Sequence, residues 1–260
     1  MQQKKFLGQH FLHDKNIAKK IVRLAQIKRS DNVLEIGPGK GILTKEILKK
    51  CNKLIAFEID QELYRHLKKS INSEKLILIN KDILKDNFSV LTEADKWKVV
   101  ANIPYNITSP LIFKLIEQKD LFSTITLMMQ KEVGDRLASQ ANTKAYGRIS
   151  VKVQMHYKVR KLFAVPPSVF YPPPKVNSAV MQLWPHREKN EIKNRKLLDT
   201  IINKSFQHRR KMLRTSLKSL FSAEQYGKIL EIEFDFRKRP EKLDYNEFID
   251  LSNKIFLKIS

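Results

Sequence analysis

The sequence predicts an α/β protein, with a mainly parallel sheet in a first domain, residues 1–185, and a small helical domain, residues 186–260. Three observations lead to this fold class. Apolar runs of strand length alternate with segments of helical periodicity through the first part of the chain. Several of these runs end in a glycine, an acid or an amide, as strands do at the ligand-binding edge of an open sheet. From residue 186 onward only helical spacing remains.

The composition indicates a soluble and strongly basic protein. Of 260 residues, 42% are hydrophobic and 30% are charged, and the formal net charge is +23. Such an excess favours a polyanionic partner, either nucleic acid or an acidic membrane surface, although a Lys-rich genome bias would also contribute. No apolar run reaches the ~20 residues of a membrane span, and the N-terminal residues lack a signal-peptide core. The single Cys51 excludes an internal disulfide and a multi-Cys zinc site, so we expect a cytoplasmic protein without a metal.

The first strand and its loop begin a predicted ligand-binding half. A basic and aromatic lead-in, residues 5–12, precedes a helix that begins after Asp14. A strand at residues 33–36 then runs into residues 37–41, which hold three of the seven glycines, and a helix follows. Glycine lets the backbone turn tightly and lets a ligand approach it. The spacing is shorter than the dinucleotide fingerprint and lacks the ending of a P-loop, so a plain turn stays an alternative.

The next two strands each lead to a carboxylate. Residues 54–57 end at Glu58, about 20 residues beyond the first glycine, where an acid conventionally binds the two ribose hydroxyls of a nucleoside. Residues 76–79 are followed by Asp82 and Ile83, which suit the amino group and the face of an adenine. Each carboxylate alone would equally suit a solvated loop. Together they predict a nucleoside-type cofactor across the carboxyl edge of the sheet.

A fourth strand, residues 99–101, leads into Asn102-Ile103-Pro104-Tyr105, which we expect to carry the chemistry. Pro104 ends the strand ladder, so the four residues should form a loop at the carboxyl edge. The Asn102 side-chain oxygen and the Ile103 carbonyl are suited to accept the hydrogens of an exocyclic amine, with Tyr105 stacked on the ring. Taken alone, the four residues more often mark a strand-terminating turn with a packed tyrosine.

Three further strands are predicted at residues 125–129, 159–165 and 178–184, whereas periodicity does not distinguish helix from strand at residues 149–157. Residues 166–175 hold five of the ten prolines, which stiffen the loop between the last two strands. The loop would present Phe170 either as a second stacking wall opposite Tyr105 or as part of a rigid connector.

The helical domain contains a strongly basic segment. Asp244 and Glu247 form a capping box ahead of the last helix. Residues 204–214 contain no acid and include four clustered cations: Arg209, Arg210, Lys211 and Arg214. Such a run usually marks a solvated helix face. In a chain of this net charge, we predict a contact with RNA or DNA.

Taken in order, these motifs resemble the bacterial KsgA family, the small-subunit ribosomal RNA adenine dimethyltransferases. The matching blocks run along nearly the whole chain, at residues 8–12, 35–41, 58–60, 102–110, 130–133, 146–151, 170–176 and 206–211. The resemblance implies a Rossmann-like class I methyltransferase sheet of seven strands, the last antiparallel, with an all-helical C-terminal domain. Two residues differ from the common pattern of that family. Ile42 stands where a smaller residue is frequent, and Ile103 stands where Leu is more common.

The resemblance also implies the cofactor, the substrate and the residues that bind them. The cofactor would be S-adenosylmethionine, bound by Gln9, His10, Leu12, Gly37, Gly39, Glu58, Ile59, Asp82, Ile83 and Asn102. The catalytic residues would be Asn102, Ile103, Pro104, Tyr105 and Phe170. The substrate would be two adjacent adenines near the 3′ end of small-subunit ribosomal RNA, within an assembling 30S subunit. We expect a monomer that binds RNA through Arg209, Arg210, Lys211 and Arg214, without a membrane or a metal.

Three other functions share parts of this pattern. An Erm-type large-subunit RNA methyltransferase has similar cofactor and base motifs, but Pro110, Phe113 and the blocks at 130–133, 146–151 and 206–211 favour the KsgA family. A non-catalytic RNA-binding assembly factor is disfavoured because Gly37, Glu58, Asn102 and Tyr105 are intact. Base-flipping motifs alone do not separate an RNA enzyme from a DNA adenine methyltransferase.

Overall fold

The computed structural model describes residues 10–91, 96–186 and 191–260. The chain divides into two compact units, Met1–Asp135 with Tyr157–Pro185, and Arg136–His156 with His186–Ser260. The expected first domain, residues 1–185, included the segment Arg136–His156, which the structure groups with the second unit. The reason is packing, because Tyr146, Val151 and Met155 of this segment lie in the apolar core of that unit.

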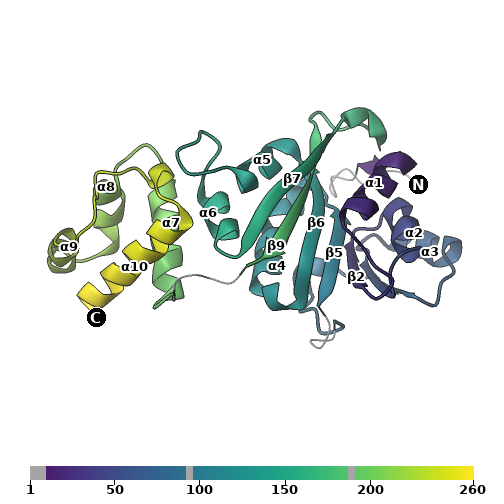
Figure 1. Ribbon diagram of the computed structural model, residues 1–260, viewed down its shortest axis with the longest axis horizontal. Coiled ribbons are helices and arrows are strands. Elements are labelled where there is room, and N and C mark those ends of the chain that lie inside the picture. The colour runs from purple at the N-terminus through teal and green to yellow at the C-terminus, as the bar shows by residue number, and fades with distance from the viewer. Residues whose placement is uncertain (1–9, 92–95, 187–190) are drawn as a thin grey trace. The chain divides into compact units, whose positions relative to one another are not determined.

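A sheet of seven strands forms the centre of the first unit, as predicted. In chain order the strands are β2 (Asn32–Ile36), β3 (Lys53–Phe57), β4 (Leu76–Ile79), β5 (Trp97–Asn102), β6 (Phe122–Gln130), β7 (Tyr157–Val165) and β9 (Ser178–Pro185). Their spatial order is β4-β3-β2-β5-β6-β9-β7, and β9, the last in the chain, runs antiparallel to both neighbours (Figure 1). Val33 and Leu34, successive residues of β2, are both fully buried. The sheet is therefore covered on both faces there, which explains the continuous apolar runs.

Helices follow the strands of the first unit. They are α1 (Lys15–Leu24), α2 (Ile42–Leu48), α3 (Gln61–Ser70) and α4 (Thr108–Glu117), with 3₁₀ turns η2 (Ile83–Lys85), η3 (Tyr105–Ile107), η4 (Lys119–Leu121) and η5 (Pro167–Val169). The helix α5 (Lys131–Ala138) belongs to this unit up to Asp135 and to the second unit from Arg136. Asp14 caps α1 as predicted, because its carboxylate accepts hydrogen bonds from the backbone of Asn16 at 2.7 Å and Ile17 at 3.0 Å. Asp60 caps α3 in the same way, which fixes the chain direction just after Glu58.

Two short strands tie the start of the described chain to the proline-rich loop. β1 (Phe11–Leu12) pairs antiparallel with β8 (Phe170–Tyr171), so Leu12 lies opposite Phe170. Leu12 and Phe170 are both buried in a core cluster of the first unit. Other buried members of this cluster are Ala18, Ile21, Val22, Val33, Leu43, Ile47, Leu54, Val100, Met128, Val165 and Val180. Because side chains alternate along a strand, Tyr171 points the other way and is 67% exposed.

The second unit is helical in its described residues. Its helices are α6 (Arg148–Gln154), α7 (Arg195–Gln207), α8 (Leu213–Leu217), α9 (Ala223–Leu230) and α10 (Tyr245–Ile259), with turns η6 (Lys218–Leu220) and η7 (Pro240–Lys242). The run at 149–157 is helical to Gln154, and β7 begins at Tyr157. The predicted capping box is confirmed, since Asp244 and Glu247 each accept the other's backbone N–H at 2.9 Å. The core of this unit includes Leu198, Ile201, Leu217, Phe248 and Leu251.

Candidate active site

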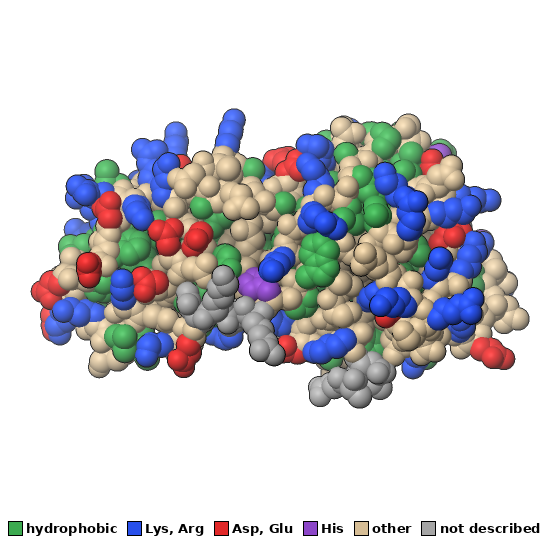
Figure 2. Space-filling model, in the orientation of Figure 1, with side chains coloured by type: hydrophobic (Ala, Val, Ile, Leu, Met, Phe, Trp, Pro, Cys, Tyr) green, Lys and Arg blue, Asp and Glu red, His purple; other side chains and the backbone are tan. Residues whose placement is uncertain are grey.

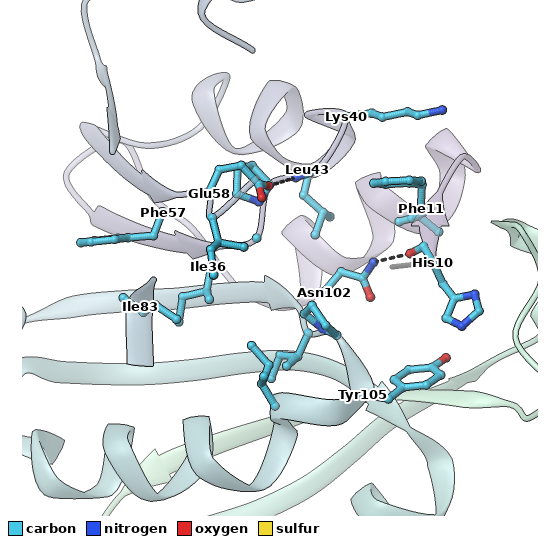
Figure 3. Close-up of a pocket in the computed structure, with 18 of the residues that line it drawn as sticks. His10, Phe11, Ile36, Lys40, Leu43, Phe57, Glu58, Ile83, Asn102 and Tyr105 are labelled. Carbon is cyan, nitrogen blue, oxygen red and sulfur yellow. Dashed lines mark hydrogen bonds between the residues drawn. The ribbon is translucent and has the colours of Figure 1, made fainter. Parts of the chain in front are cut away.

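A pocket lies at the carboxyl ends of β2, β3 and β5 (Figure 3). Every described cofactor candidate lines it: His10, Leu12, Gly37, Gly39, Glu58, Ile59, Asp82, Ile83 and Asn102. Ile103, Pro104 and Tyr105 line it too, whereas Gln9 lies outside the described residues. The residues predicted from separate strands therefore meet in one pocket of the first unit.

The glycine loop after β2 has a backbone that only glycine adopts readily. Gly37, Gly39 and Gly41 have φ angles of +67°, +59° and +80°, in the left-handed region. A Cβ atom on Gly41 would lie 2.8 Å from Leu67 Cδ2 and 2.9 Å from Ile71 Cδ1. The third glycine is therefore required by packing against α3, while the first two line the pocket. Without side chains, Gly37 and Gly39 leave their backbone accessible to a ligand.

Glu58 is a buried acid at the end of β3, with 3% of its surface exposed. Its Oε2 accepts a hydrogen bond from Gly39 N at 3.0 Å, and its Oε1 accepts one from Asp60 N at 2.9 Å. Burial raises the pKa of its carboxyl, while these backbone N–H groups counteract the shift. Each carboxylate oxygen has a second lone pair, so the pair of oxygens still suits the two hydroxyls of a ribose.

The neighbouring part of the pocket combines an acid with apolar surface. Asp82 begins η2, where its Oδ1 accepts a hydrogen bond from Leu84 N at 2.9 Å. Its second oxygen is then available for an amino group of a ligand. Ile59 is 50% exposed although it is a large apolar residue, and Ile83 lines the same pocket. An exposed isoleucine beside a carboxylate matches the face and the amino group of an adenine.

Asn102 is held by the N-terminal segment. Its Nδ2 donates a hydrogen bond to the backbone carbonyl of His10 at 3.2 Å (Figure 3). A carbonyl only accepts, so this contact identifies the amide nitrogen and leaves Oδ1 as a hydrogen-bond acceptor. The next residue, Ile103, donates its N–H to Met128 O at 3.0 Å, which anchors the loop to β6. The loop therefore presents an acceptor whose side chain is held by His10 and whose neighbouring backbone is held by β6.

Tyr105 and His10 form an aromatic pair at the same end of the pocket. Their ring centroids lie 5.5 Å apart, with the planes tilted by 33°. His10 Nδ1 lies 2.8 Å from Pro172 O, and since that oxygen accepts, Nδ1 carries the hydrogen. The Tyr105 hydroxyl lies 2.7 Å from Ser178 Oγ, and burial raises the pKa of this phenol, which keeps it neutral. Tyr105 therefore lines the pocket as a neutral, anchored ring.

Phe170 does not line this pocket. It is 3% exposed and packs with Leu12 in the core, because its pairing in β1–β8 turns it inward. The ring that faces Tyr105 is that of His10. A stacking role for Phe170 stays a prediction, and the structure assigns it a packing role in this conformation.

The comparisons with known proteins agree on one family. The family model for ribosomal RNA adenine dimethylase matches residues 1–256. A ribosomal RNA small subunit methyltransferase A from Crocosphaera subtropica is 41% identical over 266 residues, covering 97% of this chain and 98% of the relative. The chain belongs to the ribosomal RNA adenine dimethylase family. Its sheet, with an antiparallel last strand, is accordingly the predicted class I methyltransferase fold.

Solved structures show how closely the fold of this dimethylase family member is shared. A dimethyladenosine transferase from Plasmodium falciparum has a TM-score of 0.81 and 32% identity, covering 96% of this chain and 98% of that one. The 23S rRNA methyltransferase ErmE has a TM-score of 0.68 and 22% identity, covering 95% and 99%. The second likeness concerns the fold alone, whereas the first includes substantial sequence identity.

In the basic segment of this dimethylase family member, one cation is bound within the protein and three are exposed. Arg209 uses all three guanidinium nitrogens within the second unit, with Nε donating to Glu241 Oε2 at 2.7 Å, Nη1 to Lys144 O at 2.7 Å and Nη2 to Thr143 O at 3.1 Å. Three neighbouring cations are exposed: Arg210, Lys211 and Arg214. Arg209 to Lys211 lie in the turn between α7 and α8, rather than on a helix face. Cationic side chains outnumber acidic ones over the visible face (Figure 2).

Two contacts of the site were missed by sequence reasoning. The His10 carbonyl orients Asn102, and Ser178 anchors Tyr105. The sequence near these residues gave no sign of either contact. Every residue has a backbone carbonyl, and Ser178 is one of many serines. The position of Ser178 as first residue of an antiparallel strand was the one available clue.

Among the described residues, no helix is long and apolar enough to cross a membrane. In the same part of the chain, no three His, Cys, Asp or Glu side chains gather as a metal-binding group. The pocket offers hydrogen-bond acceptors, apolar surface, several aromatic rings and the two lysines Lys40 and Lys81.

Proposed function

We propose that this protein transfers methyl groups from S-adenosylmethionine to N6 of two adjacent adenines near the 3′ end of small-subunit ribosomal RNA. The product would be N6,N6-dimethyladenosine in each position. The observation that carries the proposal is Asn102, whose Nδ2 is bound to the His10 carbonyl, so that Oδ1 serves as an acceptor in the pocket that Glu58 also lines. Family membership supports the same substrate class.

The cofactor half of the pocket suits S-adenosylmethionine. Glu58 would accept both ribose hydroxyls, and Asp82 would accept the adenine amino group beside Ile59 and Ile83. Gly37 and Gly39 would let the ligand approach the loop, and His10 and Leu12 would close the N-terminal side. When bound, this cofactor supplies an electrophilic methyl group on a sulfonium. The fit rests on a buried acid with free lone pairs beside exposed apolar surface.

The base half of the pocket would activate a weak nucleophile. The exocyclic amine of adenine is poorly nucleophilic because its lone pair is delocalised into the ring. Asn102 Oδ1 and the Ile103 carbonyl would accept its two hydrogens and draw the nitrogen toward pyramidal geometry, which frees the lone pair. Tyr105 would hold the base by stacking. Positioning and electrostatics then account for most of the acceleration, and the cationic product loses its proton to water.

Phe170 enters the proposal through its place in the proline-rich loop and through the family resemblance. To stack on a base opposite Tyr105, its ring would have to leave the core cluster that it shares with Leu12. A stacking role for Phe170 therefore requires a rearrangement of this packing when RNA binds.

The RNA contact would be made by the exposed cations of the second unit. Arg210, Lys211 and Arg214 are free to approach phosphates, whereas Arg209 holds the surrounding loops together. We propose small-subunit ribosomal RNA within an assembling 30S subunit as the partner, and a monomeric enzyme. Phosphate contacts of this kind set affinity and its salt dependence without reading sequence.

The test is to map methylated adenines by primer extension on small-subunit RNA, both naked and in particles, after incubation with the purified protein and cofactor. Two adjacent stops near the 3′ end are expected with the native chain. The Asn102→Ala variant should lose about 100-fold or more in turnover, as for removal of a preorganised polar group. Asn72→Ala, at an exposed position, is the matched control. Modification confined to large-subunit RNA or to DNA would refute the proposal.

A further inference from the structure

Tyr105 and Ser178 make a side-chain contact across the edge of the sheet. Their hydroxyl oxygens are 2.7 Å apart, and they are separated by 73 positions in the sequence. Ser178 is completely buried, while Tyr105 is partly buried and lines the pocket. A buried hydroxyl aimed at the tip of a pocket-lining ring restricts how that ring is oriented.

The sheet topology explains why a serine of β9 reaches this ring. The parallel strands end at the pocket edge, and β9 is antiparallel to β6 and β7, so its first residue lies at that same edge. Ser178 pairs with Gln130 at the end of β6 and with Val165 at the end of β7. Its backbone is therefore held from both sides, which makes it a rigid anchor.

Tyr105, by contrast, stands on a short element. It begins η3, a 3₁₀ turn that follows Pro104 and has no side-chain cap. A three-residue turn holds a side chain less firmly than a strand inside a sheet, because few hydrogen bonds define it. The His10 ring contacts Tyr105 at a centroid distance of 5.5 Å, but His10 only precedes the two-residue strand β1. The firm attachment of the ring is thus at its hydroxyl.

We propose that Ser178 is a positioning residue, which sets the plane of the Tyr105 ring for stacking on the target adenine. This inference rests on the proposed function. Three other buried serines behave differently, since the hydroxyls of Ser205, Ser216 and Ser252 have no partner in the described part of the chain. A fourth, Ser150, donates to the backbone carbonyl of Arg136 in the second unit. The Ser178 hydroxyl is thus directed to one partner, and that partner is the ring expected to contact the base.

The test compares Ser178→Ala, Tyr105→Phe and the double variant in the full-length chain. Tyr105→Phe keeps the stacking ring and removes only its anchor. Each single variant should lower kcat/KM for the RNA by about three- to tenfold, the range expected when one hydrogen bond is removed. The double variant should be no less active than either single, because the two hydroxyls act only on each other. The affinity for S-adenosylmethionine should stay within about twofold of native.

A second readout separates ring positioning from folding. A hairpin RNA with 2-aminopurine at the first target position reports stacking as fluorescence quenching, which should be weaker in both single variants. Ser205→Ala, equally buried but without a hydroxyl partner among the described residues, is the control and should match the native chain. If Ser178→Ala does not fold, Tyr105→Phe still decides, because it leaves β9 intact.

The outcomes distinguish this inference from the proposed function. A native chain that methylates no ribosomal adenine refutes the proposed function. A native chain that is active, with Tyr105→Phe equal to it in kcat/KM and quenching, overturns the role of Ser178 alone. Additive effects in the double variant would also overturn it, because the hydroxyls would then act separately.

Discussion

The two ends of the pocket are built in different ways. At the cofactor end, Glu58 accepts from Asp60 N, two positions away, and from Gly39 N, 19 positions away, and Asp82 accepts from Leu84 N, two positions away. At the base end, Asn102 is bound to a carbonyl 92 positions away, and Tyr105 to a hydroxyl 73 positions away. His10 is itself tied to Pro172 across 162 positions.

This difference has a physical consequence. Local hydrogen bonds form whenever the strand ends are correct, whereas the contacts of the base end require three distant segments to meet. The cofactor end should therefore tolerate changes elsewhere in the fold. The base end should respond to changes in β1, β8 and β9 that touch no ligand.

The largest expected effect is on folding at the segment that supports the base end. Phe170→Ala should lower the free energy of unfolding by about 3–5 kcal/mol, because it removes a ring from a packed core. Denaturant unfolding measures this decrease. Tyr105→Ala, at a partly buried position, should be milder for folding while turnover on RNA falls. Full stability of Phe170→Ala without turnover would instead make Phe170 a stacking residue.

At the cofactor end, Glu58→Ala should weaken binding of S-adenosylmethionine by about 1.5–3 kcal/mol, the range for hydrogen bonds to a charged group. Calorimetry measures the affinity directly. Glu62→Ala, an exposed change on α3, is the control. Unchanged affinity in Glu58→Ala would mean that other residues bind the ribose.

The pH dependence of stability tests the buried acid Glu35, which lies in β2 and senses the charge of Glu58. Burial, with a smaller contribution from the charge of Glu58, raises the pKa of Glu35 from 4.5 to about 8. The folded chain therefore holds a proton that the unfolded chain releases, so Glu35 lowers stability progressively as pH rises from about 4.5 to 8. Within this range, Glu35 lowers the free energy of unfolding by about 1.4 kcal/mol for each pH unit. In Glu35→Gln, unfolding measured between about pH 5 and pH 8 should show a less steep decline. An unchanged slope would contradict this.

The smallest expected effect concerns the exposed cations of the second unit. Replacing Arg210, Lys211 and Arg214 with Ala should reduce the slope of log affinity for RNA against log salt. The expected reduction is roughly 0.7–0.9 for each phosphate that the variant no longer binds. Cofactor affinity should not change, since the cofactor residues lie in the first unit. The control replaces Arg65, Lys68 and Lys69, exposed cations of α3, and removes the same charge.

Equal reductions from both triple variants would leave only diffuse attraction by a basic chain. Arg209→Ala makes a further contrast. It should lower Tm while leaving the salt slope nearly unchanged, because its guanidinium is bound to Glu241 and two carbonyls.

Residue type and spacing were enough to predict the seven strands and the polar groups Glu58, Asp82 and Asn102 at their carboxyl ends, and the ordered motifs indicated the family, through which His10 and Leu12 were added. Glu58, Asp82 and Asn102 were found because each ends an apolar run, and parallel strands bring their carboxyl ends to one edge. The left-handed glycines were found because few other residues adopt that backbone. Caps at Asp14 and Asp244 also follow from residues within a few positions.

Which rings and charges are available depends instead on tertiary packing. Packing placed Phe170 in the core and His10 beside Tyr105, engaged Arg209 within its own unit, and grouped Arg136–His156 with the helices. Each of these outcomes depends on partners far away in the chain, and a local pattern carries no record of such pairings. Ser178 shows the limit most clearly, because its position arises from the direction of β9 and from the strands on either side of it.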